Sequence, residues 1–137
     1  MSKYTSKGTV FKWTISSVLT TIAATSSVES GDGTTGFSDV TSLDGSVGRE
    51  FLPTGYEDAG QPKISGFLDP AASTHKALTT DQRAQTSRAA SIVWSDSAPT
   101  SWTFTAYVRS FKGMASEGQP LRFDATFQIT GVTTYPT

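Results

Sequence analysis

"WTFTAYVRSFKGMASEGQPLRFDATFQITG" (102–131) contains the two clearest structural elements of the sequence. Apolar and polar residues alternate through 102–111 and again through 121–131, and this period of two predicts two strands that each bury one face. The segment between them, KGMASEGQP, holds two glycines and a proline, which favour a loop. We therefore expect an antiparallel pair joined by a long hairpin loop. The side chains expected to face the core are Trp102, Phe104, Ala106, Val108, Leu121, Phe123, Ala125, Phe127 and Ile129.

Three other segments also have strand patterns. The stretch VFKWTISSVLTTI (10–22) alternates with one change of phase, and a bulge or bend near Ser16 and Ser17 would restore a common apolar face. The stretches PKISGFL (62–68) and ASIVWS (90–95) are shorter candidates. The residues that such a bend would bring to one core are Phe11, Trp13, Ile15, Val18 and Ile22.

Residues 70–89 form the candidate helix. Asp69 can cap its first turn, and Pro70 suits the first helical position. Thr79 and Gln82 also fit a capping box, so two short helices are an alternative. The helix would place a thin apolar stripe on a sheet. The stripe consists of Ala71, Ala77, Leu78, Ala84 and Ala89. Together these elements predict a mainly β protein, a β-sandwich or small barrel flanked by one α-helix, with a long mid-chain loop.

The composition argues against several classes of protein. A chain of 137 residues is most simply one domain, 1–137. Its 11 basic and 12 acidic residues give a net charge of −1, which argues against electrostatic binding of nucleic acid or membranes. The absence of cysteine excludes a disulfide framework and a thiolate metal site. The N-terminal MSKYTSKG has no apolar run behind its lysines, so we expect no secretory signal and synthesis in a cytoplasm.

The segment 25–61 is irregular and only sparsely apolar. Compact domains seldom carry structureless loops longer than about 12–15 residues unless the loop functions or is disordered. The large apolar side chains in it need a surface to pack on, and the commonest partner is another copy of the same chain. A long surface Ω-loop, or an unrecognised pair of strands, is the alternative. The apolar residues of the segment are Val28, Phe37, Val40, Leu43, Val47, Phe51, Leu52, Tyr56 and Ala59.

No short motif predicts a cofactor or a metal. GDGTTG (31–36) matches the glycine pattern of dinucleotide-binding loops, but no buried strand precedes it and no helix pattern follows, so it is interpreted as a flexible turn. Asp32, Asp39 and Asp44 lack the spacing of a calcium-binding loop, and turn-forming aspartates explain them better.

Catalysis is also poorly supported. His75 is the sole histidine, is expected to be exposed at the start of the helix, and has no nucleophile elbow to serve. Glu57 and Asp58 are adjacent and should diverge, whereas a glycosidase needs two facing carboxylates. A sugar-stacking platform would require exposed tryptophans, and the strand patterns favour the core for at least two of the three. These are Trp13, Trp94 and Trp102.

A series of weak motifs in order carries a family resemblance. The central stretch DVTSLDGSVGREFLPTGYEDAGQPKISGFLDP (39–70) resembles the signature of tail tube proteins from long, flexible, non-contractile-tailed bacteriophages. Its parts are Asp39-Val40-Thr41, Asp44, Arg49-Glu50-Phe51, the turn Pro53 to Asp58, the strand Ile64 to Leu68, and Asp69-Pro70. WTISSVLTTI resembles the first strand of that family, and the closing strand pair with Thr130-Gly131 resembles its end. The likeness covers roughly residues 11–132.

The resemblance implies a structural protein without catalysis or cofactor, which forms hexameric rings stacked into the tail tube of a virion, assembled in the host cytoplasm. Double-stranded DNA would pass through the lumen without specific binding, past the polar face of the 121–131 strand or its partner. Tape-measure, tail-terminator and distal-tail proteins would be further partners. Residues 1–8 would be an N-terminal arm, 25–61 an inter-subunit loop and 132–137 a C-terminal tail. The expected self-assembly residues are Phe37, Asp39, Arg49, Glu50, Phe51, Leu52, Tyr56, Glu57 and Asp58.

Two alternatives of different classes stay open, and a hydrolytic enzyme, which would have to use His75, is the weaker of them. A virion-surface or carbohydrate-binding β-sandwich module, like those of adhesins, would also be rich in strands, serine and threonine and free of cysteine. Such a module would need exposed aromatic rings.

Overall fold

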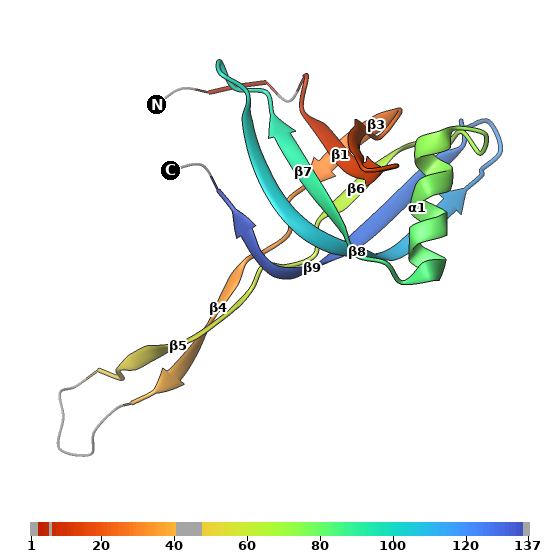
Figure 1. The fold of residues 1–137 in the computed structure, drawn as a ribbon. Coiled ribbons are helices and arrows are strands. Elements are labelled where there is room, and N and C mark those ends of the chain that lie inside the picture. The colour runs from red at the N-terminus through yellow and green to blue at the C-terminus, as the bar shows by residue number, and fades with distance from the viewer. Residues whose placement is uncertain (1–2, 6, 41–47, 136–137) are drawn as a thin grey trace.

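The computed structural model describes residues 3–5, 7–40 and 48–135. It contains a seven-stranded antiparallel sheet, a separate two-stranded sheet and one helix (Figure 1). The large sheet has the order β2-β1-β7-β8-β9-β6-β3. Its strands are β1 (Val10–Ile15), β2 (Val18–Thr21), β3 (Thr25–Glu29), β6 (Lys63–Phe67), β7 (Arg88–Trp94), β8 (Thr100–Met114) and β9 (Arg122–Thr134). The small sheet pairs β4 (Thr34–Asp39) with β5 (Phe51–Asp58), and the helix is α1 (Ser73–Ala84). The predicted fold class is confirmed.

The two long strands predicted from 102–131 form the middle of the large sheet. β8 and β9 are antiparallel and place Ala106 opposite Ile129 and Val108 opposite Phe127. The expected alternation is confirmed for these four side chains, which are buried, but the prediction for Leu121 is wrong, because it lies before β9 begins and is exposed. Register shifts interrupt the pairing twice, and such bulges increase local bend and twist. Both strands therefore curve around the core.

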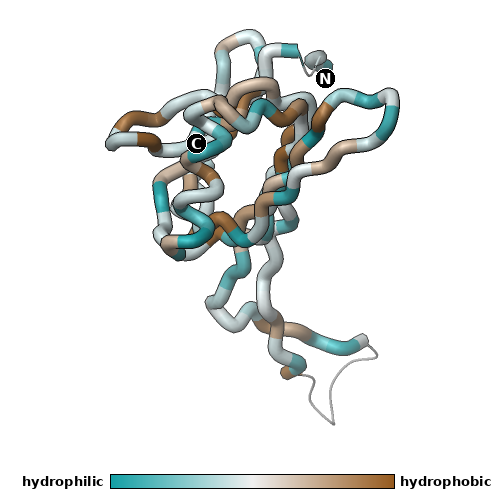
Figure 2. The backbone as a smooth tube through the Cα atoms, turned by 90° about the vertical axis from the view of Figure 1, so that its right-hand side faces the viewer, coloured by the Kyte–Doolittle hydropathy of each residue, from teal (hydrophilic) through white to brown (hydrophobic). Residues whose placement is uncertain are grey.

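The core lies inside this curved sheet. Figure 2 shows the chain curling into an open ring, with one hairpin projecting away from it. Phe11 stacks on Phe127 with ring centroids 4.8 Å apart, and Trp13 lies 5.1 Å from the same ring. Burying one such large side chain contributes about 1.5–3 kcal/mol, so this cluster holds β1 against β9.

The phase change in 10–22 is a hairpin turn and not a bulge. Ser16 and Ser17 have φ of 51° and 66°, and Ile15 pairs directly with Val18. A two-residue turn with both φ positive matches the twist of a β-hairpin. The chain therefore reverses between β1 and β2. Ile22 reaches the core as expected, but the prediction for Val18 is wrong, because it lies beside the turn and is exposed.

The helix is single and shorter than the predicted range 70–89. Asp69 does not cap it: its carboxylate accepts from the backbone N–H of Ala71 at 3.0 Å, which makes a turn before the helix. The helix ends where Gln85 takes a left-handed conformation with φ of 54°. Leu78 is the one large apolar side chain on the buried face of the helix, and the other buried residues of that face are polar. The prediction that alanines form the buried stripe is therefore wrong. The buried helix residues are Thr74, His75, Leu78 and Asp81.

The segment 25–61 is more regular than a loop. Its first residues form β3, which pairs with β6 at the end of the large sheet. The rest builds the β4–β5 hairpin, so the alternative of an unrecognised strand pair is the one the structure supports. Among the described residues, no helix has the length and apolar character needed to cross a membrane.

Candidate self-assembly surface

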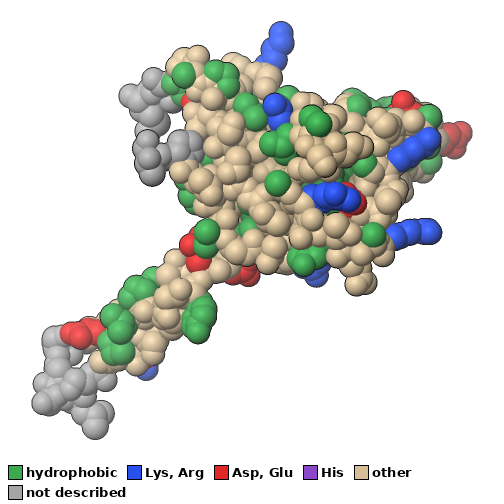
Figure 3. All heavy atoms as spheres, viewed as in Figure 1, with side chains coloured by type: hydrophobic (Ala, Val, Ile, Leu, Met, Phe, Trp, Pro, Cys, Tyr) green, Lys and Arg blue, Asp and Glu red, His purple; other side chains and the backbone are tan. Residues whose placement is uncertain are grey.

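The β4–β5 hairpin projects from the body of the protein as an arm. We call β4, β5, Val40 and residues 48–50 the arm, and the rest of the described chain the head. Every side chain of β4 and β5 is exposed. Hydrophobic side chains gather along the projection (Figure 3). The arm is held by its own backbone pairing, which extends to a hydrogen bond of 2.9 Å from Val40 N–H to the carbonyl of Glu50. Residues 41–47, with Asp44, Leu43 and Val47, lie outside the described residues.

A wide bulge divides the arm. Thr35 pairs with Glu57 and Phe37 pairs with Pro53, so Gly36 alone faces the three residues 54–56. The hydroxyl of Thr54 donates to the carbonyl of Gly36 at 3.1 Å. A Cβ on Gly36 would lie 2.6 Å from that hydroxyl oxygen, so a larger residue there would displace the Thr54 side chain from its hydrogen bond. The bulge is therefore stabilised by the hydrogen bond between Thr54 and Gly36, and it is a specific feature of the hairpin and not an irregularity.

Both faces of the arm carry apolar side chains. Directly paired residues share a face, so Phe37 lies beside Pro53 and Asp39 beside Phe51, while Leu52 lies beside Ser38 on the other face. Phe37 is 61% exposed, Phe51 56%, Leu52 57% and Tyr56 82%. Large apolar side chains exposed together on one projection are typical of an interaction site.

The charged residues of the arm do not form a catalytic pair. Arg49 Nη1 lies 3.7 Å from Asp39 Oδ2, with side chains 77% and 42% exposed, so the ion pair is solvated and contributes little to stability. Glu57 and Asp58 are successive strand residues and point to opposite faces. Asp58 Oδ1 accepts from the Gly60 N–H at 2.9 Å, which fixes it at the base of the arm.

Two glycines form the root of the arm. Gly31 and Gly60 have φ of 80° and 96°, a range that favours glycine. A Cβ on Gly60 would lie 2.5 Å from the carbonyl oxygen of Asp32, and one on Gly31 would lie 2.7 Å from the carbonyl carbon of Gln61. The entering and leaving chains thus cross in backbone contact. The root is bonded to β9, since Ile129 N–H donates to the Gly60 carbonyl at 3.3 Å.

The structure brings all nine predicted self-assembly residues onto the arm. Asp39 and Arg49 form an ion pair, and Phe37 and Phe51 share one face. Sequence reasoning missed the root glycines and Val40, which is also exposed. The stretch GDGTTG, interpreted from sequence as a turn, leads through this root into β4. The close contact between Gly31 and the backbone of Gln61 explains why glycine occupies position 31.

His75 is part of the packing and not a catalytic group. The prediction that it is exposed is wrong, because it is almost fully buried. Its Nε2 donates to the Ala23 carbonyl at 2.8 Å, and its Nδ1 accepts from the Asp69 N–H at 3.2 Å. The ring packs 4.6 Å from Phe123. Nε2 therefore holds the turn after β2 against the helix, and Nδ1 holds the turn that precedes the helix.

The other candidate sites have structural explanations. Trp13 lies in the core and Trp94 packs against it. Trp94 and Trp102 meet edge to face at 5.0 Å, and Trp102 meets Tyr135 in the same way at 4.9 Å, so these rings do not form a flat platform. Within residues 3–5, 7–40 and 48–135, no cluster of three or more His, Cys, Asp or Glu residues is placed to hold a metal.

The near-zero net charge conceals a strong asymmetry. Residues 29–58 contain seven acidic side chains and one arginine, which gives a net charge of −6. The rest of the chain contains five acidic and ten basic side chains, which gives +5. No acidic residue occurs before Glu29, whereas Lys3, Lys7 and Lys12 do. The segment that carries the arm is thus acidic and the head is basic.

Comparison with known proteins identifies the fold. No family model matches the sequence, and no curated protein matches it. A chain from the tail of an empty gene transfer agent (GTA) particle with C6 symmetry matches with a TM-score of 0.81 and 16% identity, over 98% of this chain and all of that one. The SPP1 tail tube matches with a TM-score of 0.69 and 12% identity, over 93% of this chain and 77% of that one. A sheath/tube terminator of an extracellular contractile injection system matches with a TM-score of 0.76 and 10% identity, over 100% and 99%. At such identities the likeness establishes the fold, and the chain has the tail-tube-like fold that its central motifs predicted.

Proposed function

We propose that this chain is a structural protein of a virion tail, which assembles into hexameric rings stacked as a tube for double-stranded DNA. The observation that carries the proposal is the match over nearly the whole chain to a tail particle with C6 symmetry. The polypeptide is non-enzymatic in this role. Assembly would take place in the host cytoplasm.

The arm supplies the main contact between subunits. Its phenylalanines, leucine and tyrosine lie in water in a single copy, and burial of each would contribute about 1.5–3 kcal/mol. An isolated two-stranded hairpin is at best marginally stable, so a neighbouring subunit would also order it. The interface residues are Phe37, Asp39, Arg49, Glu50, Phe51, Leu52, Tyr56, Glu57 and Asp58.

The edges of the large sheet also favour assembly. β2 and β3 end the strand order, and each leaves one row of backbone groups outside the sheet. Free edges are normally protected, and contacts with neighbouring subunits would cover them. The outward polar side chains of β9 and β8, among them Thr105 and Thr130, would suit a lumen that DNA crosses without being gripped. Tape-measure, tail-terminator and distal-tail proteins are the further partners proposed.

Electron microscopy of the purified protein over a range of concentrations tests the proposal. Six-fold rings or tubes are expected to increase with concentration, and sedimentation velocity should report the loss of monomer in parallel. Small monodisperse particles under all conditions would contradict it.

A further inference from the structure

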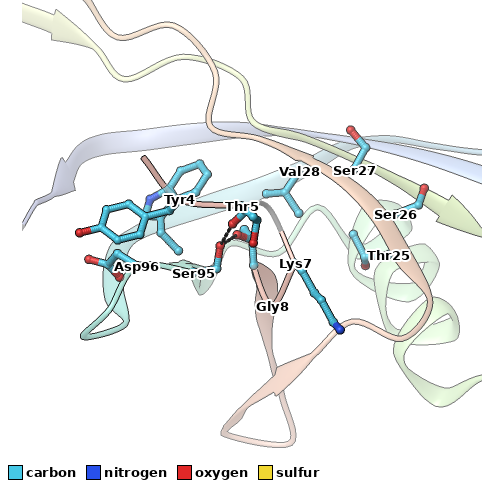
Figure 4. A pocket seen from close by; sticks show the side chains of 12 residues that line it. Tyr4, Thr5, Lys7, Gly8, Thr25, Ser26, Ser27, Val28, Ser95 and Asp96 are labelled. Atoms are coloured by element: carbon cyan, nitrogen blue, oxygen red, sulfur yellow. Dashed lines mark hydrogen bonds between the residues drawn. The ribbon is translucent and has the colours of Figure 1, made fainter. Parts of the chain in front are cut away.

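A groove on the head lies at the end opposite the arm. It has a volume of about 710 Å³ and runs between the N-terminal segment, β3 and the end of β7 (Figure 4). Tyr4, Val28 and Trp94 give it apolar walls, and Lys7 lies at its rim. In Figures 1 and 2 the N-terminal segment and the arm lie at opposite ends of the molecule. Opposite placement of two different surfaces is what an open-ended stack requires, because each copy then contacts the next head to tail.

Among the described residues, the groove also contains a sheet edge that pairs with no other strand. β3 lines it through Thr25 to Val28 and pairs with β6 on its other side, and the sheet order ends there. A strand from outside could therefore add to β3 through backbone hydrogen bonds, while its side chains enter the apolar part of the groove.

Charge identifies the occupant. Residues 1–28 carry three lysines and no acidic residue, and the segment that contains the arm has a net charge of −6. The groove also has an acidic residue, Asp96, but its carboxylate is already bound by the hydroxyl of Thr100 at 2.5 Å and by the Thr100 N–H at 2.8 Å. The hydroxyl contact holds the pKa of Asp96 below its ordinary value. Asp96 therefore stays ionised, but the three lysines of residues 1–28 outnumber it and leave a net positive charge for an acidic partner.

We propose that the acidic arm of one copy docks along β3 in the N-terminal groove of the next copy, with Lys3 and Lys7 facing its carboxylates. This rests on the proposed tube function and specifies which surfaces meet. A strand of eight residues spans roughly 26 Å, so β5 can reach well beyond its own head. The contact joins unlike surfaces and gives the stack a direction.

Cysteine cross-linking tests the placement directly, because the native chain has no cysteine. Ser27→Cys places a thiol on β3 in the groove, and Leu52→Cys places one on the arm. A mixture of these two single variants should give a disulfide-linked dimer under assembly conditions. The matched control mixes Leu52→Cys with Lys112→Cys, whose thiol lies on exposed β8 away from the groove, and should give at least tenfold less dimer. Equal yields would overturn the proposal.

A charge exchange tests the electrostatic part. Lys7→Glu and Glu57→Lys should each raise the critical concentration for assembly about tenfold, and the double variant should recover most of that loss. Lys112→Glu should change it less than twofold. If the single variants assemble like the native chain, the groove is not the docking site, although tubes would still support the proposed function. If a dilute Ser27→Cys/Leu52→Cys double variant cross-links within one chain, the arm occupies its own groove and the proposal fails.

Discussion

The indole Nε1 of Trp13 donates a hydrogen bond of 2.7 Å to the carboxylate of Asp81, across 68 residues of chain. Both side chains are buried. Asp81 also accepts from Arg88, whose Nη2 lies 3.2 Å from Oδ1. The pair joins β1 to a helix that has no side-chain cap and little apolar surface. The helix is therefore fixed to the sheet by a buried polar contact as well as by Leu78.

Asp81→Ala should destabilise the fold strongly. The change leaves a buried indole N–H and a half-buried guanidinium without their acceptor, and we expect a loss of about 2–4 kcal/mol in the free energy of unfolding. Urea unfolding followed by tryptophan fluorescence measures it. Glu117→Ala, in the exposed β8–β9 loop, is the control and should change stability by less than about 0.5 kcal/mol. A loss below about 1 kcal/mol for Asp81→Ala would show that the contact is dispensable.

Arm substitutions should affect assembly and leave folding intact. Phe37→Ala, Phe51→Ala and Arg49→Ala remove exposed side chains, so each should change the free energy of unfolding by less than about 0.5 kcal/mol. Each should nevertheless raise the concentration needed for rings or tubes, as measured by sedimentation. Phe123→Ala is the opposite control: its ring is fully buried and the loss should be about 3–5 kcal/mol. Arm variants that unfold as easily as Phe123→Ala would refute the assignment.

Gly60→Ala should misdirect the arm. Its φ of 96° is strained for alanine, and the new Cβ would meet the Asp32 backbone, so we expect a cost of about 1–3 kcal/mol and a clear loss of assembly. Gly118→Ala is matched to it, because Gly118 has φ of 74° and no atom near the added Cβ. That control should lose about 1 kcal/mol or less and assemble normally. Similar behaviour of the two variants would mean that the crossing at the root does not orient the arm.

Amide exchange should separate the arm from the head. In the monomer the amides of 34–39 and 51–58 have only one partner strand each and no core beneath them, so they should exchange much faster than those of β8 and β9. In assembled tubes the arm amides should become protected. Equal protection of residues 30–60 in both states would contradict a role of the arm in contacts between subunits.

The strands that were predicted correctly are those whose own sequence alternates between apolar and polar residues. β8 and β9 each bury one face, so apolar side chains recur at every second position. The arm lacks that signal because neither of its faces is buried by the head, and because Gly36, Pro53 and Gly55 interrupt it. The residues proposed for self-assembly were still identifiable, since large apolar side chains in a polar segment are conspicuous without any structure.

Residues held by distant partners could not be predicted. His75 was expected to be exposed because its neighbours are polar, but its partner Ala23 lies 52 residues away in the chain. The hydrogen bond between Trp13 and Asp81 also joins residues far apart in the chain, although the burial of Trp13 itself was predicted. A polar residue on a helix gives no local sign that a strand will cover it.

The sequence by itself determined that the protein is mainly β with one helix, because one-sided burial and turn chemistry leave local periodic patterns, and its ordered central motifs carried the resemblance to a family of folds. It also contained the charge asymmetry between the arm segment and the rest of the chain. Only the tertiary structure decided that the acidic residues stand on a projecting hairpin, that two glycines cross at its root, and that a groove with a free strand edge lies at the opposite end of the head. Those features arise where segments far apart in the chain come into contact, and such contacts follow from packing of the whole molecule.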